Sequence, residues 1–122
     1  MVKDLKVLEL ASVLAGPSVG QFFSELGSEV IKVENLCAGG DVTRTWRVKD
    51  EKTDDRSAYF CSVNWGKKSI AVDLNRAEGR QIVHELSKKS DIIIASYKAG
   101  DAKKFGVDYQ TISTLNPKVV YG

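Results

Sequence analysis

The stretch VLELASVLAGP at residues 7–17, followed by EVIKVE at residues 29–34, decides the expected fold. It predicts a buried strand, a tight turn with Gly16 and Pro17, a short helix and a second buried strand. This order is typical of the first unit of a doubly wound α/β domain, whose ligands bind at the carboxyl ends of the strands. The stretch therefore predicts where a ligand binds before it indicates which ligand.

The rest of the chain continues this alternation of strands and helices. Consecutive apolar residues, typical of strands covered on both faces, predict strands at residues 6–10, 29–33, 69–72, 91–95 and 118–121. Apolar residues at helical spacing predict helices at residues 17–27, 76–89 and 109–115. We therefore expect a Rossmann-like α/β fold with a mainly parallel sheet. The polar segment at residues 35–56 is expected to be a long connection, and such connections are usually functional or mobile.

Composition bounds the class of protein. The length of 122 residues fits one domain, and 18 basic against 16 acidic side chains leave a net charge of +2, which gives no reason to expect a nucleic-acid partner. No apolar run approaches the ~20 residues that span a bilayer, and the first residues lack the apolar region of a secretion signal. Cys37 and Cys61 are too few and too far apart for a disulfide framework or a zinc site. We expect reduced thiols, no metal and a cytoplasmic location.

Several catalytic and cofactor motifs are weak or missing. The three positions of a dinucleotide-binding glycine motif hold Ala15, Pro17 and Gly20, so only one matches, although Glu34 ends the second strand as a ribose-binding acid would. Residues 66–69 (GKKS) lack the upstream glycine of a phosphate-binding loop, and no Gly-x-Ser-x-Gly nucleophile motif occurs. His84 is expected to be a helix-surface or partly packed residue, and Cys37 an inert thiol.

Six segments, taken in order and spacing, carry a resemblance to a known family: VLAGP (13–17), LGSEVIKVE (26–34), GDVTR (40–44), SVN (62–64), KKSIAVDL (67–74) and NPKVVYG (116–122). They resemble the amino-terminal part of the class III coenzyme A transferases. That family includes formyl-CoA and carnitine CoA-transferases, the succinate–hydroxymethylglutarate CoA-transferase and the α-methylacyl-CoA racemases. The resemblance covers essentially the whole chain. It implies that residues 1–122 are the amino-terminal α/β CoA-binding portion of a larger fold whose two subunits interlock. The chain also ends on an apolar strand with no helix to cover it, which is what we expect of an amino-terminal piece.

The resemblance implies a set of CoA-binding residues. The first turn would lie along the pantetheine and adenine, residues 72–75 would cup the adenine and ribose, and residues 96–98 match a loop usually written Asn-Phe-Arg or Asn-Phe-Gly. Lys104 matches a basic phosphate contact, and Asn35 falls where many members carry an arginine near the CoA phosphates. The implied residues are Val13, Leu14, Ala15, Asn35, Val72, Asp73, Leu74, Asn75, Ser96, Tyr97, Lys98 and Lys104.

Charge and aromatic character near these positions suit a ligand with several phosphates. The candidate cations are Lys67, Lys68, Lys98, Lys103 and Lys104, and for Lys67 and Lys103 a solvated surface position is the favoured interpretation. Tyr97 either packs on the adenine or pantetheine or is an ordinary half-buried aromatic residue. Ala95-Ser96 stands where the family commonly has Glu-Asn, and Asn35 lacks the common arginine charge. We expect both departures to weaken CoA binding or reshape its loop without changing the fold.

The reacting groups of the family fall outside the residues of this chain. The transferase branch uses an aspartate that attacks the acyl-CoA and becomes a mixed anhydride and then an aspartyl thioester. The racemase branch uses a histidine and an aspartate as its acid–base pair. In both branches these residues come after the position that matches Gly122, and none of the aspartates at positions 41, 73, 91, 101 and 108 matches the nucleophile. We therefore name no catalytic residue.

The expected function is the CoA-binding part of an acyl-CoA:carboxylate CoA-transferase. Residues 43–46 (TRTW) and 62–72 look most like the dicarboxylic-acid branch. The alternatives are a fragment of an α-methylacyl-CoA racemase, and a truncated, non-catalytic domain that binds CoA or self-associates. The resemblance implies an acyl-CoA and a carboxylic acid as substrates, no tightly bound cofactor, and a homodimer for the full-length protein. For a eukaryotic protein, a mitochondrial or peroxisomal compartment is the alternative to the cytoplasm. The sequence specifies neither acyl donor nor acceptor. We expect the chain by itself to be inactive, to expose apolar surface and to self-associate.

Overall fold

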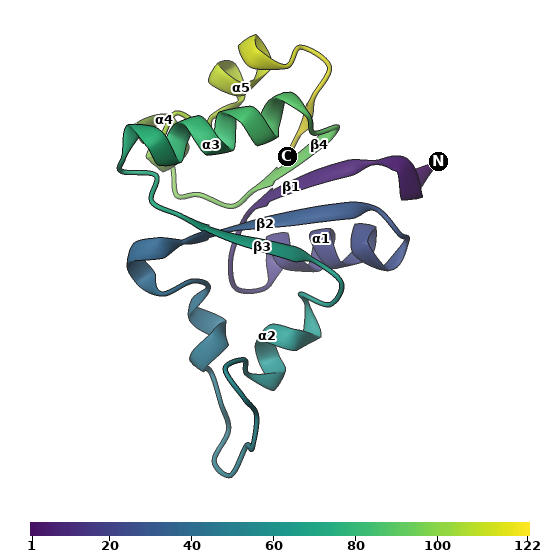
Figure 1. Ribbon diagram of the computed structural model, residues 1–122, viewed down its shortest axis with the longest axis vertical. Coiled ribbons are helices and arrows are strands. Elements are labelled where there is room, and N and C mark those ends of the chain that lie inside the picture. Colours follow the sequence, from purple (N-terminus) through teal and green to yellow (C-terminus); the bar gives the residue numbers. More distant parts are fainter.

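Five parallel strands form one sheet in the order β3-β2-β1-β4-β5 in the computed structural model, which describes all of residues 1–122 (Figure 1). The first strand, β1, lies at the centre, and the crossovers place its neighbours β2 and β4 on opposite sides. The expected doubly wound sheet is confirmed, and every strand pair is parallel. The strands are β1 (Lys6–Leu10), β2 (Glu29–Asn35), β3 (Lys68–Val72), β4 (Ile92–Ala95) and β5 (Val120–Tyr121).

Two strands differ from their expected bounds for reasons that the pairing explains. Strand β2 continues two residues further, because Glu34 and Asn35 pair with the last residues of β3. Strand β5 begins at Val120, since the Val119 N–H donates to the carbonyl of Asn116 and closes a turn there. The remaining strands lie within one residue of the predicted ranges.

Helices cover both faces of the sheet (Figure 1). Helix α1 (Ala15–Glu25) contacts β1, β2 and β4 on one face, while α3 (Ala77–Lys88) and α5 (Tyr109–Leu115) pack together on the other. Pro17 lies in the first turn of α1, where a missing N–H is tolerated. The shorter elements are η1 (Val2–Asp4), η2 (Leu36–Ala38), η3 (Val42–Thr45), α2 (Ala58–Ser62) and α4 (Asp101–Lys104).

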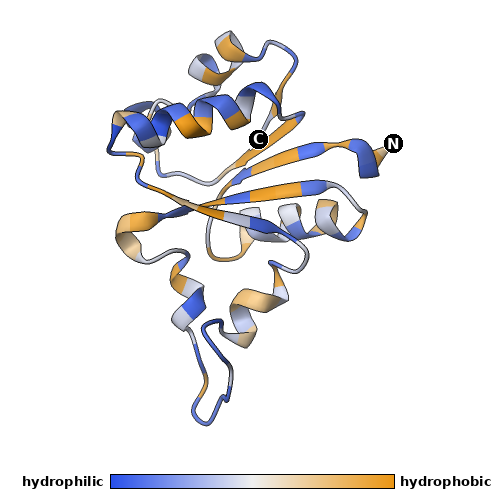
Figure 2. Ribbon diagram, in the orientation of Figure 1, coloured by the Kyte–Doolittle hydropathy of each residue, from blue (hydrophilic) through white to orange (hydrophobic).

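The apolar core is divided between the two faces, as the alternation of side chains along a strand requires. Val7 belongs to the smaller cluster under α1, and its neighbour Leu8 belongs to the larger cluster with Val83 of α3 and Ile112 of α5. Figure 2 shows the hydrophobic colouring concentrated in the strands at the centre of the molecule. The same alternation puts Glu9 and Lys32 on the α1 face, where both are buried.

The polar segment after β2 has more structure than the expected long connection. The side chains of Asn35 and Asp41 accept hydrogen bonds from backbone N–H groups at the starts of η2 and η3. Ser57 joins the end of the segment back to η3, because its hydroxyl donates to the carbonyl of Thr43. The loop between η3 and α2 projects away from the sheet (Figure 1). No helix of the structure is both long and apolar enough to cross a membrane.

Candidate functional site

A cavity of about 290 Å³ opens at the carboxyl ends of β1, β2, β3 and β4. Its apolar walls come from Leu10, Val33, Val72 and Leu74, and its polar groups from the end of β2 and from the segments that leave the strands. The remaining lining residues are Ala11, Ser12, Lys32, Glu34, Asn35, Ala38, Gly40, Asp41, Val42, Asn75, Ser96, Tyr97 and Phe105. An open parallel sheet binds ligands at this edge, so the cavity lies where the sequence predicted a site.

The structure gathers half of the predicted CoA-binding residues around this cavity. Those that line it are Asn35, Val72, Leu74, Asn75, Ser96 and Tyr97. The other six, which do not line it, are Val13, Leu14, Ala15, Asp73, Lys98 and Lys104. Val13 and Leu14 form the turn that follows the lining residue Ser12, and Ala15 begins α1. Lys98 is exposed in the segment that joins β4 to α4. The twelve residues thus remain a prediction for CoA contact, with six placed at a common cavity.

The β3–α3 connection is held in place by its own hydrogen bonds. The Asp73 carboxylate accepts from the backbone N–H of Asn75 at 2.9 Å and from its side-chain amide at 3.0 Å. These bonds lower the pKa of Asp73. From α3, Arg80 donates to the carbonyls of Leu74 at 3.0 Å and Asn75 at 3.2 Å. The connection therefore presents Leu74 and Asn75 to the cavity in a fixed conformation.

Tyr97 fits both interpretations of its role, because it is half-buried and also lines the cavity. Its ring centroid lies 6.0 Å from that of Phe105, and burial raises its pKa to about 12. The exposed Lys104 places its ammonium 5.5 Å from the Phe105 ring centroid, so one predicted phosphate contact stands beside the cavity wall. Lys103 is exposed, as the surface interpretation predicts.

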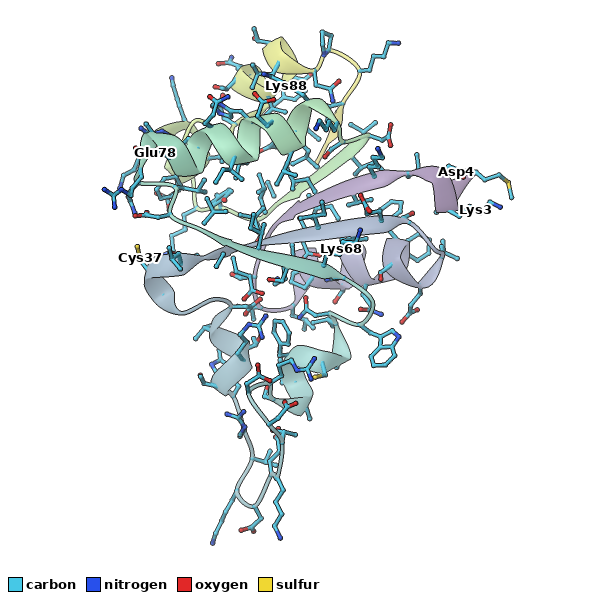
Figure 3. The ribbon with its side chains drawn as sticks, in the orientation of Figure 1. Lys3, Asp4, Cys37, Lys68, Glu78 and Lys88 are labelled. Carbon is cyan, nitrogen blue, oxygen red and sulfur yellow. The ribbon has the colours of Figure 1, made fainter.

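Two of the candidate lysines lie elsewhere. Lys68, labelled in Figure 3, is the first residue of β3, at the opposite end of the sheet from the cavity, and pairs with Glu29. For Lys67 the favoured surface position is wrong. Its side chain is 2% exposed, and its ammonium lies 2.7 Å from Glu9 Oε2 and donates to the Pro17 carbonyl at 2.8 Å. Burial lowers the pKa of Lys67, an effect that its pairing with Glu9 partly offsets.

Lys67 belongs to a buried ionic network that the sequence analysis missed. Lys32 Nζ lies 2.9 Å from Glu9 Oε1 and 2.9 Å from Asp41 Oδ2, and it donates to the Ala11 carbonyl at 2.7 Å. Two carboxylates and two ammonium groups balance in charge, which a buried site requires. The signal was present in the sequence: Glu9 and Lys32 are charged residues inside apolar strands. Such residues are almost never fully buried without a partner.

A second buried pair joins the end of β2 to η3. A dinucleotide site would use Glu34 to bind ribose, but here the Glu34 carboxylate accepts hydrogen bonds from Arg44. The Arg44 guanidinium donates through Nε at 2.8 Å and Nη2 at 2.6 Å, and Ser69 adds a bond at 2.6 Å. Burial opposes ionisation, but these bonds outweigh it and lower the pKa of Glu34 to about 2. The Arg44 guanidinium carbon also lies 3.9 Å from the centroid of the Phe60 ring.

The remaining reactive side chains show no catalytic arrangement. Cys37 is exposed in the turn after β2 (Figure 3), and hydrogen bonding to Asp73 raises the pKa of its thiol, which fits the predicted inert role. His84 lies partly packed on α3, with Nε2 2.7 Å from the Gly106 carbonyl oxygen, as expected. No group of three or more His, Cys, Asp or Glu side chains is close enough together to hold a metal ion.

Comparison with known proteins identifies the family of this fold and cavity. CoA-transferase family III matches residues 2–122. The chain therefore belongs to CoA-transferase family III, and the resemblance drawn from its motifs is confirmed.

Individual relatives agree with the family. A succinate–glutarate CoA-transferase of Agrobacterium fabrum is 41% identical over 98% of this chain, which covers 31% of that protein. The human succinyl-CoA:glutarate CoA-transferase is 39% identical over 98% of this chain and 27% of its own length. A crystal structure of a CaiB/BaiF family protein from Brucella suis is 42% identical, with a TM-score of 0.87, over 98% of this chain and 32% of that one. The chain thus spans about 30% of the length of the proteins it matches.

Proposed function

We propose that this chain is the CoA-binding part of an acyl-CoA:carboxylate CoA-transferase that acts on dicarboxylic acids. The observation that carries the proposal is the cavity at the strand ends, around which Asn35, Val72, Leu74, Asn75, Ser96 and Tyr97 come together. Its apolar walls suit an adenine ring, and its amide and hydroxyl groups suit the ribose and the ring nitrogens. Lys98 and Lys104, both exposed, would meet the phosphates.

In the parent reaction an aspartate outside residues 1–122 would act as nucleophile. Its carboxylate would attack the thioester carbonyl and release CoA thiolate, leaving a mixed anhydride. The thiolate would then attack the aspartyl carbonyl, giving an aspartyl thioester and the free donor acid. The acceptor carboxylate would then attack the aspartyl thioester and release CoA thiolate, leaving a second mixed anhydride. The thiolate would attack the acceptor's carbonyl in that anhydride, giving the acceptor's CoA thioester and the free aspartate carboxylate. The buried aspartate of this chain, Asp41, is not available for that role, because Lys32 and Thr43 already engage its carboxylate.

The named relatives favour transfer over racemisation. The bacterial and human proteins described above are both CoA-transferases that act with succinate or succinyl-CoA and glutarate. We therefore propose a dicarboxylate donor and acceptor for the parent protein, with no tightly bound cofactor and a homodimeric state. We also propose a cytoplasmic location for the parent protein, or a mitochondrial or peroxisomal one in a eukaryote.

Calorimetric titration with CoA tests the site. We expect saturable binding to the chain, which Ser96→Trp weakens at least about tenfold, or ~1.4 kcal/mol, because the indole would fill a cavity that the exposed Ser96 borders. Ser62→Trp is the matched control, since Ser62 is also exposed but lies on α2 outside the cavity. Equal binding by both variants would place CoA elsewhere.

A second assay separates binding from catalysis. Incubation of the chain with succinyl-CoA and glutarate is expected to give no glutaryl-CoA, because the proposed nucleophile is not among its residues. Turnover by the chain would overturn the aspartyl assignment. Exchange of the α-proton of a 2-methylacyl-CoA by the full-length protein would instead favour the racemase branch.

A further inference from the structure

The turn between β1 and α1 contains a backbone conformation that its sequence does not favour. Val13 has φ of +70°, in the left-handed region that glycine adopts readily and that a β-branched residue rarely enters. The only other non-glycine residue with positive φ is Asp50, in the projecting loop. Such a conformation persists only where the surroundings impose it. The question is which groups hold Val13.

One buried ion pair contacts the turn on both sides of Ser12. The Val13 N–H donates to the Asp41 carboxylate, with distances of 3.3 Å to Oδ2 and 3.4 Å to Oδ1. Lys32 donates to the Ala11 carbonyl at 2.7 Å, and its ammonium lies 2.9 Å from Asp41 Oδ2. Both side chains are almost inaccessible, at 1% for Lys32 and 0% for Asp41. Asp41 and Lys32, both outside the turn, therefore hold the Val13 N–H and the Ala11 carbonyl on either side of Ser12.

The pair is itself held by further bonds, so it has little freedom to follow the turn. Thr43 donates to Asp41 Oδ1 from its backbone at 3.0 Å and from its hydroxyl at 2.8 Å. The Lys32 ammonium also lies 2.9 Å from Glu9 Oε1, and the Glu9 carboxylate is paired with Lys67 as well. These bonds outweigh the effect of burial and lower the pKa of Asp41, which stays a carboxylate that accepts hydrogen bonds.

The turn that the pair holds is part of the cavity wall. Ala11 and Ser12 line the cavity together with Lys32 and Asp41. A buried ion pair is a poor source of net stability, because the cost of removing both charges from water offsets their attraction. Its recurring value is to fix a geometry, and the geometry fixed here is that of a strained turn at the site.

We propose that Lys32 and Asp41 are positioning residues that hold the β1–α1 turn in its strained conformation and thereby set the wall of the cavity against bound CoA. This assignment rests on the proposed CoA site. Neither residue reacts with the acyl group. The pair acts on the ligand through residues 11–13.

Relief of the strain at Val13 distinguishes a positioning role of Asp41 from a purely structural one. Asp41→Asn keeps the shape of the side chain but loses its charge, and we expect CoA affinity to fall at least about tenfold. Val13→Gly, which also removes a predicted CoA contact, is the reference for the next variant, because glycine adopts positive φ without penalty. When Asp41→Asn is added to Val13→Gly, affinity should fall by less than about twofold further, since the turn no longer needs Asp41. Asp108→Asn, at the N-cap of α5, is the control and should bind as the wild type.

The backbone at position 13 gives a readout that does not depend on CoA. In Asp41→Asn we expect amide hydrogen exchange at Val13 to accelerate at least about tenfold beyond the change in global stability. If the wild type fails to bind CoA, the proposed function fails, and exchange at Val13 still decides whether the pair holds the turn. Unchanged exchange overturns the assignment. Unchanged affinity in Asp41→Asn overturns it too, as does an equally large loss when Asp41→Asn is added to Val13→Gly.

A second variant covers the case in which Asp41→Asn does not fold. Lys32→Met combined with Asp41→Leu removes both charges and leaves the Glu9–Lys67 pair balanced, a kind of replacement that often preserves stability. Folded protein with weakened CoA binding and fast exchange at Val13 supports the assignment. If the folded variant matches the wild type in both CoA affinity and amide exchange at Val13, the assignment is overturned.

Discussion

Lys67 and Lys68 show how sharply one step along the chain changes the role of a side chain. The Lys67 side chain is 2% exposed and its ammonium is shared among Glu9, Pro17 and Asn64. The Lys68 side chain is 68% exposed and pairs with the half-exposed Glu29. Ion pairs in water contribute little, whereas the loss of one partner from a buried pair leaves a charge without compensation. The two lysines should therefore differ in their effect on stability.

Replacement of each lysine by methionine measures that difference. We expect Lys67→Met to lower the free energy of unfolding by about 3–5 kcal/mol, because Glu9 stays buried with Lys32 as its only cation. Lys68→Met should cost less than about 1 kcal/mol. Urea denaturation of both variants checks the values. Similar losses in the two variants would contradict the buried position of Lys67.

At this scale the sequence predicts which residues are unusual better than it predicts their partners. The charged residues Glu9, Lys32 and Glu34 stand out because they interrupt apolar strands. Their partners could not be predicted, since Arg44 comes from the short η3 and Lys67 from the connection before β3, and the course of both depends on the tertiary structure. The same limit applies to the CoA residues. Resemblance named twelve, but only the folded chain shows which six share a cavity.

Helix α1 lies close to the sheet because glycines face it. A Cβ atom built at Gly20 would lie 1.8 Å from Glu9 Oε2 and 3.2 Å from Lys67 Nζ. At Gly16 a Cβ atom would lie 2.3 Å from that of Ala11. The small residues thus let the helix pass directly over the buried ionic network, and they bring its first turn against the strand end that borders the cavity.

Gly20→Ala tests this close approach. Alanine favours a helix by about 1 kcal/mol over glycine, so propensity alone predicts stabilisation. We expect the opposite, a loss of about 1–3 kcal/mol, because the added methyl group must displace the carboxylate of Glu9. The neighbouring Val19→Ala, at an exposed position of the same helix, should change stability by less than about 0.5 kcal/mol. Thermal unfolding compares the two, and stabilisation by Gly20→Ala would contradict the close packing.

Element length decided which parts of the fold could be predicted. The strands and the three longer helices have apolar periodicity that extends over enough residues to be recognised. The helices α2 and α4, with five and four residues, are too short to show a period. The structure of residues 35–57 depends instead on single side chains, Asn35, Asp41 and Ser57, that bond to nearby backbone groups. Such capping residues are readable in hindsight, but they also occur in ordinary turns.

On the scale of the whole molecule, the outer face of α1 is apolar and exposed. Val19, Phe22 and Leu26, spaced along one side of the helix and its C-cap, are 48%, 58% and 47% exposed. Trp65, 76% exposed, lies next to the helix, because Ser24 donates to its carbonyl at 2.8 Å. Exposed apolar side chains gathered on one helix face are typical of an interaction site. The face points away from the sheet, so no part of residues 1–122 covers it.

We expect two copies of the chain to associate through this face. Sedimentation velocity over a range of concentrations should show a monomer–dimer equilibrium. Phe22→Ser should weaken it at least about tenfold, or ~1.4 kcal/mol, since a buried aromatic side chain contributes more than that on average. Ile82→Ser, which removes another exposed apolar side chain from α3 on the opposite face of the sheet, should leave the equilibrium unchanged. A monomer at every concentration, or equal effects of the two substitutions, would show that α1 does not mediate self-association.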